Sequence, residues 1–166
     1  MKIRKAVIDD LLRIMEVYRA AQDFMILSGN PGQWGRSYPT EDDVRNDIEN
    51  GSCHVIYDET GIHAVFAFCE GMDPYYDRID GGKWLNGEPY AAIHRVASDG
   101  KFHGVVTLAA DFCKEKYDNI RVDTHEKNLP MQHQVEKNGF VRCGTVYVRD
   151  GSPRIAYQWV KKKEEV

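Results

Sequence analysis

The stretch "SDGKFHGVVTLAADFC", residues 98–113, places a polar turn with two glycines directly before a helical pattern. The backbone N–H groups of such a turn and the positive end of a helix dipole point toward one place, so the segment could bind an anion such as a phosphate. An ordinary turn and helix that bind nothing would fit the same residues. The spacing excludes a nucleotide P-loop, G-x-x-x-x-G-K-[ST], and a dinucleotide loop, G-x-G-x-x-G.

Two loops combine aromatic residues with polar or acidic ones. Residues 27–39 contain Gln33, Trp34 and Tyr38, and residues 72–89 contain Tyr75, Trp84 and several aspartates. Aromatic ring faces attract ammonium groups and carboxylates pair with them, so we expect these loops to bind a cationic amine. In the alternative interpretation, the two tryptophans only cover the edge of the core.

Several side chains could move a proton or hold a charged substrate. Glu70 ends an apolar run, Asp123 lies in "RVDTH", and His94 and His133 carry imidazoles, which titrate close to neutral pH. Arg95 could anchor a substrate carboxylate, although a salt bridge to an acidic neighbour would occupy the same group. For each of these residues, an ordinary surface or hydrogen-bonded role is the alternative. The histidines and aspartate between residues 123 and 133 lack a spaced ligand motif, so we expect no metal.

The elements that hold these residues alternate along the chain. Strands are predicted at 2–7, 90–97 and 119–125, as a pair within 53–71 about a turn at 58–61, and as a hairpin over 140–160. Helices are predicted at 9–25, 40–51, 103–117 and 128–139, with Asp9 or Asp10, Thr40 and Asn128 as N-caps. The order β-α-α-β-β-β-α-β-α-β-β, with no internal repeat or linker, predicts one α+β domain over residues 1–166.

Composition excludes several classes of protein. The 166 residues are enough for one domain with its own core, and the net charge of −4 argues against a general nucleic-acid binder. No stretch approaches the ~18 apolar residues of a membrane span, and the N-terminus lacks the apolar region of a signal peptide. We therefore expect a soluble cytoplasmic protein with no nucleic-acid or membrane partner and with its four cysteines reduced. Exposed aromatic residues near a hairpin end leave a homodimer possible.

Two patterns together carry a family resemblance. "HRVASDGKFHGVV" has Val96 at a strand end, Lys101 and then Gly104 before a helix, and "EKNGF", residues 136–140, closes the helix that begins after Asn128. In these features the chain resembles the GNAT superfamily of acyl-CoA-dependent N-acetyltransferases over essentially its whole length. The resemblance implies an α+β, GNAT-like domain with a mixed central β-sheet, splayed central strands and flanking helices.

The resemblance also implies a binding site for acetyl-CoA as co-substrate. The pantetheine arm would lie along the strand near Val96, and the pyrophosphate would accept hydrogen bonds from backbone N–H groups between Lys101 and Thr107. Val106 departs from the Gly or Ala of the family pattern, so we expect weaker coenzyme binding than either residue would allow. The predicted coenzyme-binding residues are Val96, Ala97, Ser98, Lys101, Phe102, His103, Gly104, Val105, Val106, Thr107 and Asn128.

By the same resemblance, an amine attacks the thioester directly once a base has removed its proton. Glu70 and Asp123 are the candidate bases. Family members carry a tyrosine as general acid before "EK" in the late helix, where this chain has Val135, so His133 or Tyr147 would have to replace it. The acceptor, a small amine, amino acid or peptide, would contact Gln33, Trp34, Tyr38, Tyr75, Trp84, His94 and Arg95. The alternative is a non-catalytic acyl-CoA-binding or regulatory module.

Overall fold

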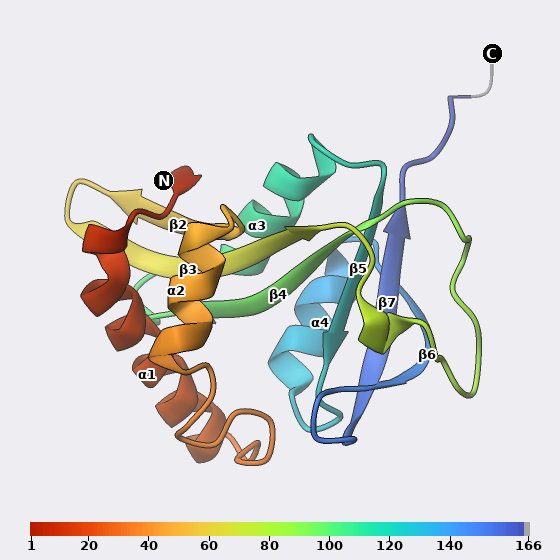
Figure 1. Ribbon diagram of the computed structural model, residues 1–166, viewed down its shortest axis with the longest axis horizontal. Coiled ribbons are helices and arrows are strands. Elements are labelled where there is room, and N and C mark those ends of the chain that lie inside the picture. The colour runs from red at the N-terminus through yellow and green to blue at the C-terminus, as the bar shows by residue number, and fades with distance from the viewer. Residues whose placement is uncertain (165–166) are drawn as a thin grey trace. The chain divides into compact units, whose positions relative to one another are not determined.

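The computed structural model describes residues 1–164. Within this part of the chain, seven strands and four α-helices follow one another in the predicted order (Figure 1). The strands are β1 (Lys2–Lys5), β2 (Cys53–Asp58), β3 (Gly61–Glu70), β4 (Ala91–Ser98), β5 (Asn119–Thr124), β6 (Val141–Tyr147) and β7 (Pro153–Val160). The helices are α1 (Leu11–Leu27), α2 (Glu41–Glu49), α3 (Val105–Lys114) and α4 (Leu129–Lys137).

The strands form one mixed sheet in the order β1-β2-β3-β4-β5-β7-β6. β1 with β2, β2 with β3, β5 with β7, and β6 with β7 pair antiparallel, whereas β4 and β5 pair parallel. In the parallel ladder, the first two residues of β4 pair with β5: Ala91 with Ile120, and Ala92 with Arg121. The predicted α+β class, with a mixed sheet and helices, is confirmed.

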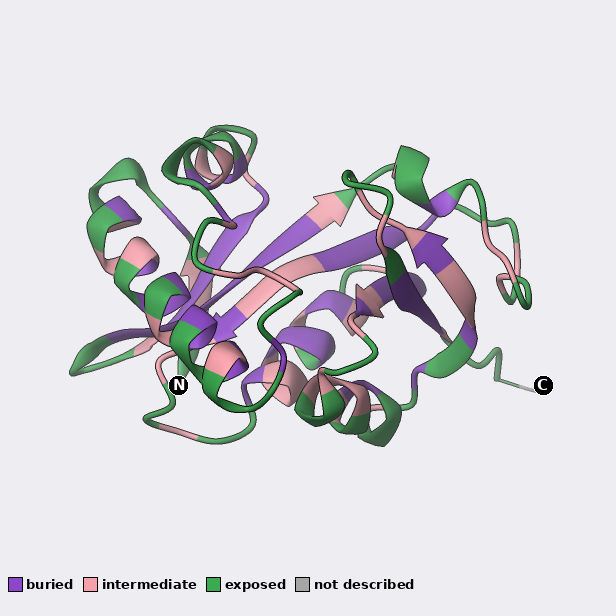
Figure 2. Cartoon of the chain, turned by 90° about the horizontal axis from the view of Figure 1, so that it is seen from below, coloured by how far each residue is buried: buried purple, intermediate pink, exposed green. Residues whose placement is uncertain are grey.

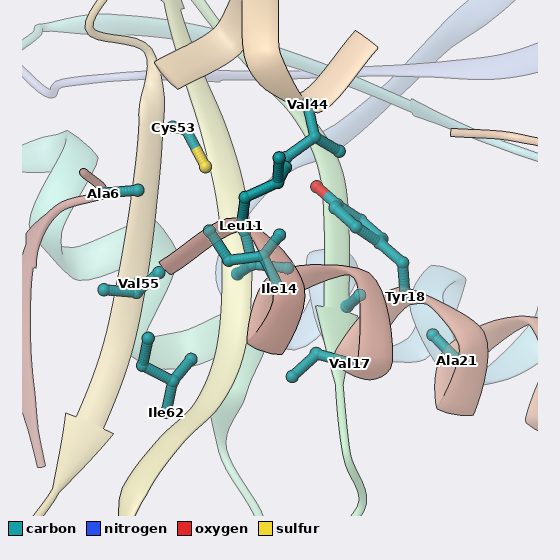
Figure 3. Close-up of a cluster of buried hydrophobic side chains, with 12 residues drawn as sticks. Ala6, Leu11, Ile14, Val17, Tyr18, Ala21, Val44, Cys53, Val55 and Ile62 are labelled. Carbon is teal, nitrogen blue, oxygen red and sulfur yellow. The ribbon is translucent and has the colours of Figure 1, made fainter. Parts of the chain in front are cut away.

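Contacts along the chain group into two compact units, the first made of residues 1–68 and 94–105. Its core packs one face of α1 onto β2 and β3, and Figure 3 shows Leu11 and Ile14 of α1 beside these strands, while the Tyr18 ring extends toward Val44. Val44 of α2 and Cys53 of β2 belong to the same cluster. The outer surface of α1 is exposed, as the green segments of Figure 2 show.

The second unit contains residues 69–93 and the chain from 106 onward. Here β5, β7 and β6 form an antiparallel group, and a smaller core joins Tyr76 and Tyr90 with Val146 and Ala156. Tyr76 lies in a short 3₁₀ turn, Pro74–Tyr76, within the loop that the sequence predicts over residues 72–89. The tyrosine ring thereby anchors this loop to the second core.

Most of the predicted helix ends agree with the structure. The Thr40 side chain accepts a hydrogen bond from the Asp43 N–H and the Asp43 carboxylate accepts one from Thr40 N, which is a capping box. Asn128 accepts from Met131 N–H, as predicted. At the start of α1, Asp10 occupies the N-cap position, as predicted, but its side chain makes no capping bond to the helix. Its carboxylate instead binds Arg4 at 2.7 Å and the Val7 N–H at 2.8 Å.

The helix expected over residues 103–117 is shorter, since α3 runs from Val105 to Lys114. Gly104 has φ of +87°, which is outside the right-handed helical region, so the helix cannot start before Val105. No helix in the described part of the chain is long and apolar enough to cross a membrane.

Candidate functional site

The loop between β4 and α3 has the backbone shape that the sequence predicts for an anion-binding turn. Gly100 and Gly104 both have positive φ, +80° and +87°. The Gly100 N–H donates to Ser98 Oγ at 3.0 Å and the Lys101 N–H to Asp99 Oδ1 at 3.0 Å, so two Asx/Ser-type turns open the loop. A Cβ on Gly104 would meet no atom within 4 Å. Glycine is therefore required here for its conformation and not for space.

The residues predicted to bind the coenzyme differ in their exposure to solvent. Lys101, His103 and Gly104 are exposed, while Val96, Ser98 and Phe102 are half-buried. Ala97 and Val105 are buried, so only their backbone groups can serve a ligand. Val106 and Thr107, in the first turn of α3, are half-buried, and Asn138 donates to Thr107 Oγ1 at 3.1 Å. The first N–H groups of any α-helix lack intrahelical partners, which leaves this turn able to donate to an anion.

β4 is distorted at Arg95, a non-glycine residue with φ of +51°. A side chain in this left-handed region is strained, so other contacts must hold it there. Tyr18 donates its hydroxyl to the Arg95 carbonyl at 2.9 Å, and the guanidinium binds both oxygens of Asp47 at 2.7 and 2.8 Å. It also donates to the Tyr38 hydroxyl at 3.2 Å. Burial opposes the positive charge, but Tyr38 and Asp47 outweigh it and raise the pKa of Arg95.

Arg95 therefore forms the salt bridge that the sequence left as an alternative to substrate binding. His94, the residue before it, is half-buried on β4. Tyr38, predicted for the acceptor, uses its carbonyl to accept from Gln22 at 2.8 Å and its hydroxyl to accept from Arg95. The side chains of Arg95 and Tyr38 thus bind other groups of the first unit.

Trp34 and Gln33 are also part of the folded structure around them. The Trp34 ring contacts Tyr18 and Tyr38 edge to face, with centroid distances of 5.8 and 6.2 Å, and packs against the first core. Gln33 Oε1 accepts from Asn30 at 2.8 Å. For Trp34, the interpretation that it covers the core edge is the one that the geometry favours.

Asp123, one of the predicted proton-transfer groups, accepts a short hydrogen bond from a buried tyrosine. Tyr76 donates its hydroxyl to Asp123 Oδ2 at 2.6 Å, and the Tyr76 side chain is 2% exposed. Burial and the nearby carboxylate raise the pKa of Tyr76 well above its ordinary value, so the phenol keeps its proton and remains a donor. Asp123 itself is half-buried on β5. The pair presents a carboxylate held by a rigid neutral donor.

Trp84 and Arg121 hold the Tyr76 turn in place. The Trp84 indole N–H donates to the Tyr76 carbonyl at 2.8 Å, and the two rings lie 5.2 Å apart. Arg121, 5% exposed, lies between the rings of Trp84 and Tyr90 at 4.0 and 3.9 Å from their centroids. Burial lowers the pKa of Arg121. Trp84 therefore fixes the loop, whereas Tyr75, which is 45% exposed, presents its ring to solvent.

The other candidate catalytic residues are Tyr147, Glu70 and His133. Tyr147 donates to Asp80 Oδ2 at 2.9 Å, and Arg78 stacks on its ring at 4.6 Å. The hydrogen bond to Asp80 raises the pKa of Tyr147. Glu70 and His133 are exposed. Val135, at the position of the family's acid, is 2% exposed and belongs to the interior side of α4.

Sequence reasoning counted Tyr76 only among the aromatic residues of the loop over residues 72–89, and it assigned no role to Arg121 or Asp47. Tyr76 was one of several aromatic residues in a long loop, and only its turn position singles it out. Asp47 lies on the inner side of α2, where the predicted helical stripe could have flagged a buried carboxylate. Among the described residues, no group of three or more His, Cys, Asp or Glu side chains could hold a metal ion.

Comparison with solved structures identifies similar proteins. A GNAT-family acetyltransferase from Streptococcus agalactiae matches with TM-score 0.86 and 34% identity, covering 98% of this chain and 96% of that one. A GNAT-family acetyltransferase from Listeria monocytogenes has TM-score 0.68 and 19% identity, covering 96% and 94%. The ribosomal-protein-alanine N-acetyltransferase from Brucella melitensis has TM-score 0.66 and 16% identity, covering 96% and 99%. No family model and no curated protein matches the sequence.

Proposed function

Since this chain belongs to the GNAT family of acetyltransferases, we propose that it transfers the acetyl group of acetyl-CoA to a primary amine of a small molecule, amino acid or peptide. The near-full-length match at 34% identity is the observation that carries this proposal. The backbone shape of the loop after β4 and the Tyr76–Asp123 pair are the local features that support it.

The coenzyme would bind through backbone groups more than through side chains. Loop residues 98–104 and the first turn of α3 offer N–H donors, and the exposed Lys101 and His103 add favourable charge for the pyrophosphate. The pantetheine amides would pair with the backbone of β4 near Val96, in the manner of an added strand. Bound acetyl-CoA supplies an activated thioester. The chain's residues bind and orient it.

We assign the general base to Asp123. An amine with pKa near 10 is about three pH units from neutrality, so its free-base form costs about 4 kcal/mol at pH 7. A carboxylate that accepts the proton, directly or through water, lowers that cost as the C–N bond forms. The Tyr76 hydroxyl holds one oxygen of Asp123 at 2.6 Å and fixes the orientation of the carboxylate.

The departing thiolate needs less help. A thiol with pKa near 8.5 is about 1.5 units from neutrality, which corresponds to about 2 kcal/mol at pH 7. Water can supply this proton, and the exposed His133 is the candidate side chain on α4. Tyr147 is a poorer candidate than the sequence suggested, because its proton is already donated to Asp80.

One observation favours the alternative of a coenzyme-binding module without turnover. The position of the family's general acid is occupied by Val135, whose side chain is buried and has no proton to give. A chain that binds acetyl-CoA but releases no thiol with any amine would fit this alternative.

The test is release of coenzyme A thiol from acetyl-CoA over a panel of amines, amino acids and peptides with free N-termini. We expect turnover with at least one acceptor. Asp123→Asn should then lower kcat/KM by about 10²- to 10⁴-fold, because the base is lost. The Kd of acetyl-CoA, measured by calorimetry, should stay within about twofold.

Asp118→Asn serves as the matched control, since Asp118 is an exposed carboxylate, 78% accessible, close to the same strand. It should turn over like the wild type. Binding without turnover on every acceptor would favour the module, and failure to bind acetyl-CoA would overturn both functions. If Glu70→Gln and not Asp123→Asn abolished turnover, the base would be Glu70.

A further inference from the structure

A chain of charged groups includes Asp99, in the loop after β4. Asp99, whose side chain is 6% exposed, accepts at Oδ2 from His63 Nδ1 at 2.9 Å and from Arg13 at 2.8 Å. Its Oδ1 accepts the Lys101 N–H at 3.0 Å, and its own N–H donates to the His63 carbonyl at 2.9 Å. The carboxylate is therefore the point where α1, β3 and the loop are joined.

The surroundings of His63 define its charge. Nε2 lies 3.0 Å from Asp58 Oδ1 and 2.7 Å from the Thr60 hydroxyl, and that hydroxyl donates its single proton to Asp58 at 2.6 Å. Both ring nitrogens thus face a carboxylate oxygen, of Asp99 or of Asp58, which can only accept. An imidazole satisfies both sides only when each nitrogen carries a proton, so the geometry is that of an imidazolium.

The pKa shifts of these groups also favour a protonated His63 between two ionised carboxylates. The hydrogen bond from His63 to Asp99 raises the pKa of His63. Burial opposes this effect, and the hydrogen bond to Asp58 adds to it. Burial acts to raise the pKa of Asp99, but the bonds from His63 and Lys101 and the charge of Arg13 outweigh it and lower the pKa. Bonds from Thr60, and then from His63, lower the pKa of Asp58 to about 2.

The other groups around His63 and Arg13 complete the charge balance. The Phe102 ring meets the imidazole edge to face at 5.9 Å, and Glu16 pairs with Arg13 at 3.1 Å on the exposed side of α1. With His63 protonated, the two cations Arg13 and His63 offset Asp58 and Asp99, and the exposed Glu16 adds a third carboxylate. When His63 loses its proton, the negative charge of this group grows by one unit beside a loop whose proposed ligand is an anion.

We propose that Arg13 and His63 are positioning residues for the phosphate-binding loop, residues 98–104, and that they neutralise Asp99 so that binding of the coenzyme pyrophosphate weakens when His63 is deprotonated. This inference rests on the proposed function, since it takes acetyl-CoA as the ligand of the loop. It assigns to the buried imidazole a role in coenzyme affinity, with no contact to the ligand and no part in the chemical step.

The experiment is calorimetric titration with acetyl-dephospho-coenzyme A at pH 6 and pH 8. This probe keeps the pyrophosphate but lacks the 3′-phosphate and the free thiol, so its own charge does not change over that range. A unit charge within about 10 Å of the ligand, partly screened, corresponds to a change in Kd of about three- to tenfold. Both chains compared carry His103→Gln, because the exposed His103 belongs to the predicted binding loop. We expect the Kd of His103→Gln to rise by this factor from pH 6 to pH 8, and that of the double variant with His63→Gln to stay nearly constant.

Keeping His103→Gln in both chains removes the exposed imidazole of the same loop from the comparison. An equal pH response with and without His63→Gln would overturn the inference alone, whereas absence of binding at both pH values would overturn the proposed function and the inference with it.

A second measurement needs no substitution. The His63 ring can be titrated by NMR in the wild-type chain, free and with the probe bound. Because binding and protonation are linked, the pKa of His63 should rise when the probe binds. A merely structural imidazole would show the same pKa in both states, and that result would contradict the proposal even if His63→Gln failed to fold.

Discussion

Asp123 and Tyr76 show how one contact can decide the use of a catalytic group. A carboxylate on a strand can rotate, and each rotamer points its oxygens differently. The 2.6 Å bond from the Tyr76 hydroxyl selects one orientation, and the packing of Tyr76 under Trp84 keeps that hydroxyl in place. Because burial raises the pKa of Tyr76, the donor stays protonated throughout the range where amines are acetylated.

Replacing Tyr76 with phenylalanine removes only this hydroxyl. We expect Tyr76→Phe to lower kcat by about tenfold, because a loosened carboxylate spends less time aligned with the amine. The KM for acetyl-CoA should change little. Steady-state kinetics with both substrates varied measures the two effects separately.

Tyr75→Phe is the control for this variant, since it removes a neighbouring hydroxyl from an exposed ring. A kcat for Tyr76→Phe equal to that of the wild type would show that the hydrogen bond does not orient the base.

At the scale of elements, α2 and β4 are joined by the Asp47–Arg95 pair. α2 starts at a capping box and places Asp47 on its inner side, where the carboxylate is 9% exposed. β4 brings Arg95 there only by taking φ of +51°. The ion pair and the Tyr18 bond hold this distortion in the strand that precedes the proposed phosphate loop.

Asp47→Asn removes the negative partner and leaves the arginine charge, 18% exposed, without compensation. Breaking a buried pair in this way costs about 3 kcal/mol. We therefore expect the free energy of unfolding, measured by urea denaturation, to fall by about that amount. Coenzyme affinity should fall as well if the distortion of β4 serves the loop.

Glu41→Gln on the same helix is the matched control. Its salt bridge with Arg45 spans one turn and is exposed, 57% and 44%, so its loss should change stability by less than about 0.5 kcal/mol. Equal destabilisation by the two variants would contradict the importance of the buried pair.

At the scale of the whole molecule, the four cysteines are distributed over both units and differ in burial. Cys53 lies in the first core, Cys113 on the inner side of α3 and Cys143 on β6, and all three are buried. Burial raises the pKa of the Cys53 and Cys113 thiols to about 12. Cys69, at the end of β3, is half-buried.

Because the thiolate is the reactive form, we expect N-ethylmaleimide at pH 7.5 to label Cys69 well before Cys53 and Cys113. Intact-mass spectra should show one early addition to the native protein and four additions after denaturation in guanidinium. Cys69→Ser should remove the early addition. Labelling of Cys53 as fast as Cys69 would show that the first unit opens readily.

Local patterns account for what could be predicted from the sequence. Alternation of apolar residues, Thr40, Asn128 and the glycines predicted the element order, and the two motifs around Gly104 and "EKNGF" predicted the family. These features depend on neighbours within a few residues. The same patterns placed Asp9 or Asp10 at the N-cap of α1 but could not predict the partner of the Asp10 carboxylate, because Arg4 lies on the preceding strand.

The amino-acid sequence by itself therefore determined the fold class, the family and the loop that is proposed to hold the coenzyme. The tertiary structure decided which titratable groups have partners. It pairs Tyr76 with Asp123 across 47 positions, Arg95 with Asp47 across 48, and Asp99 with Arg13 across 86. Such pairs form only when the strands and helices that carry them pack together, and no short-range pattern encodes that packing.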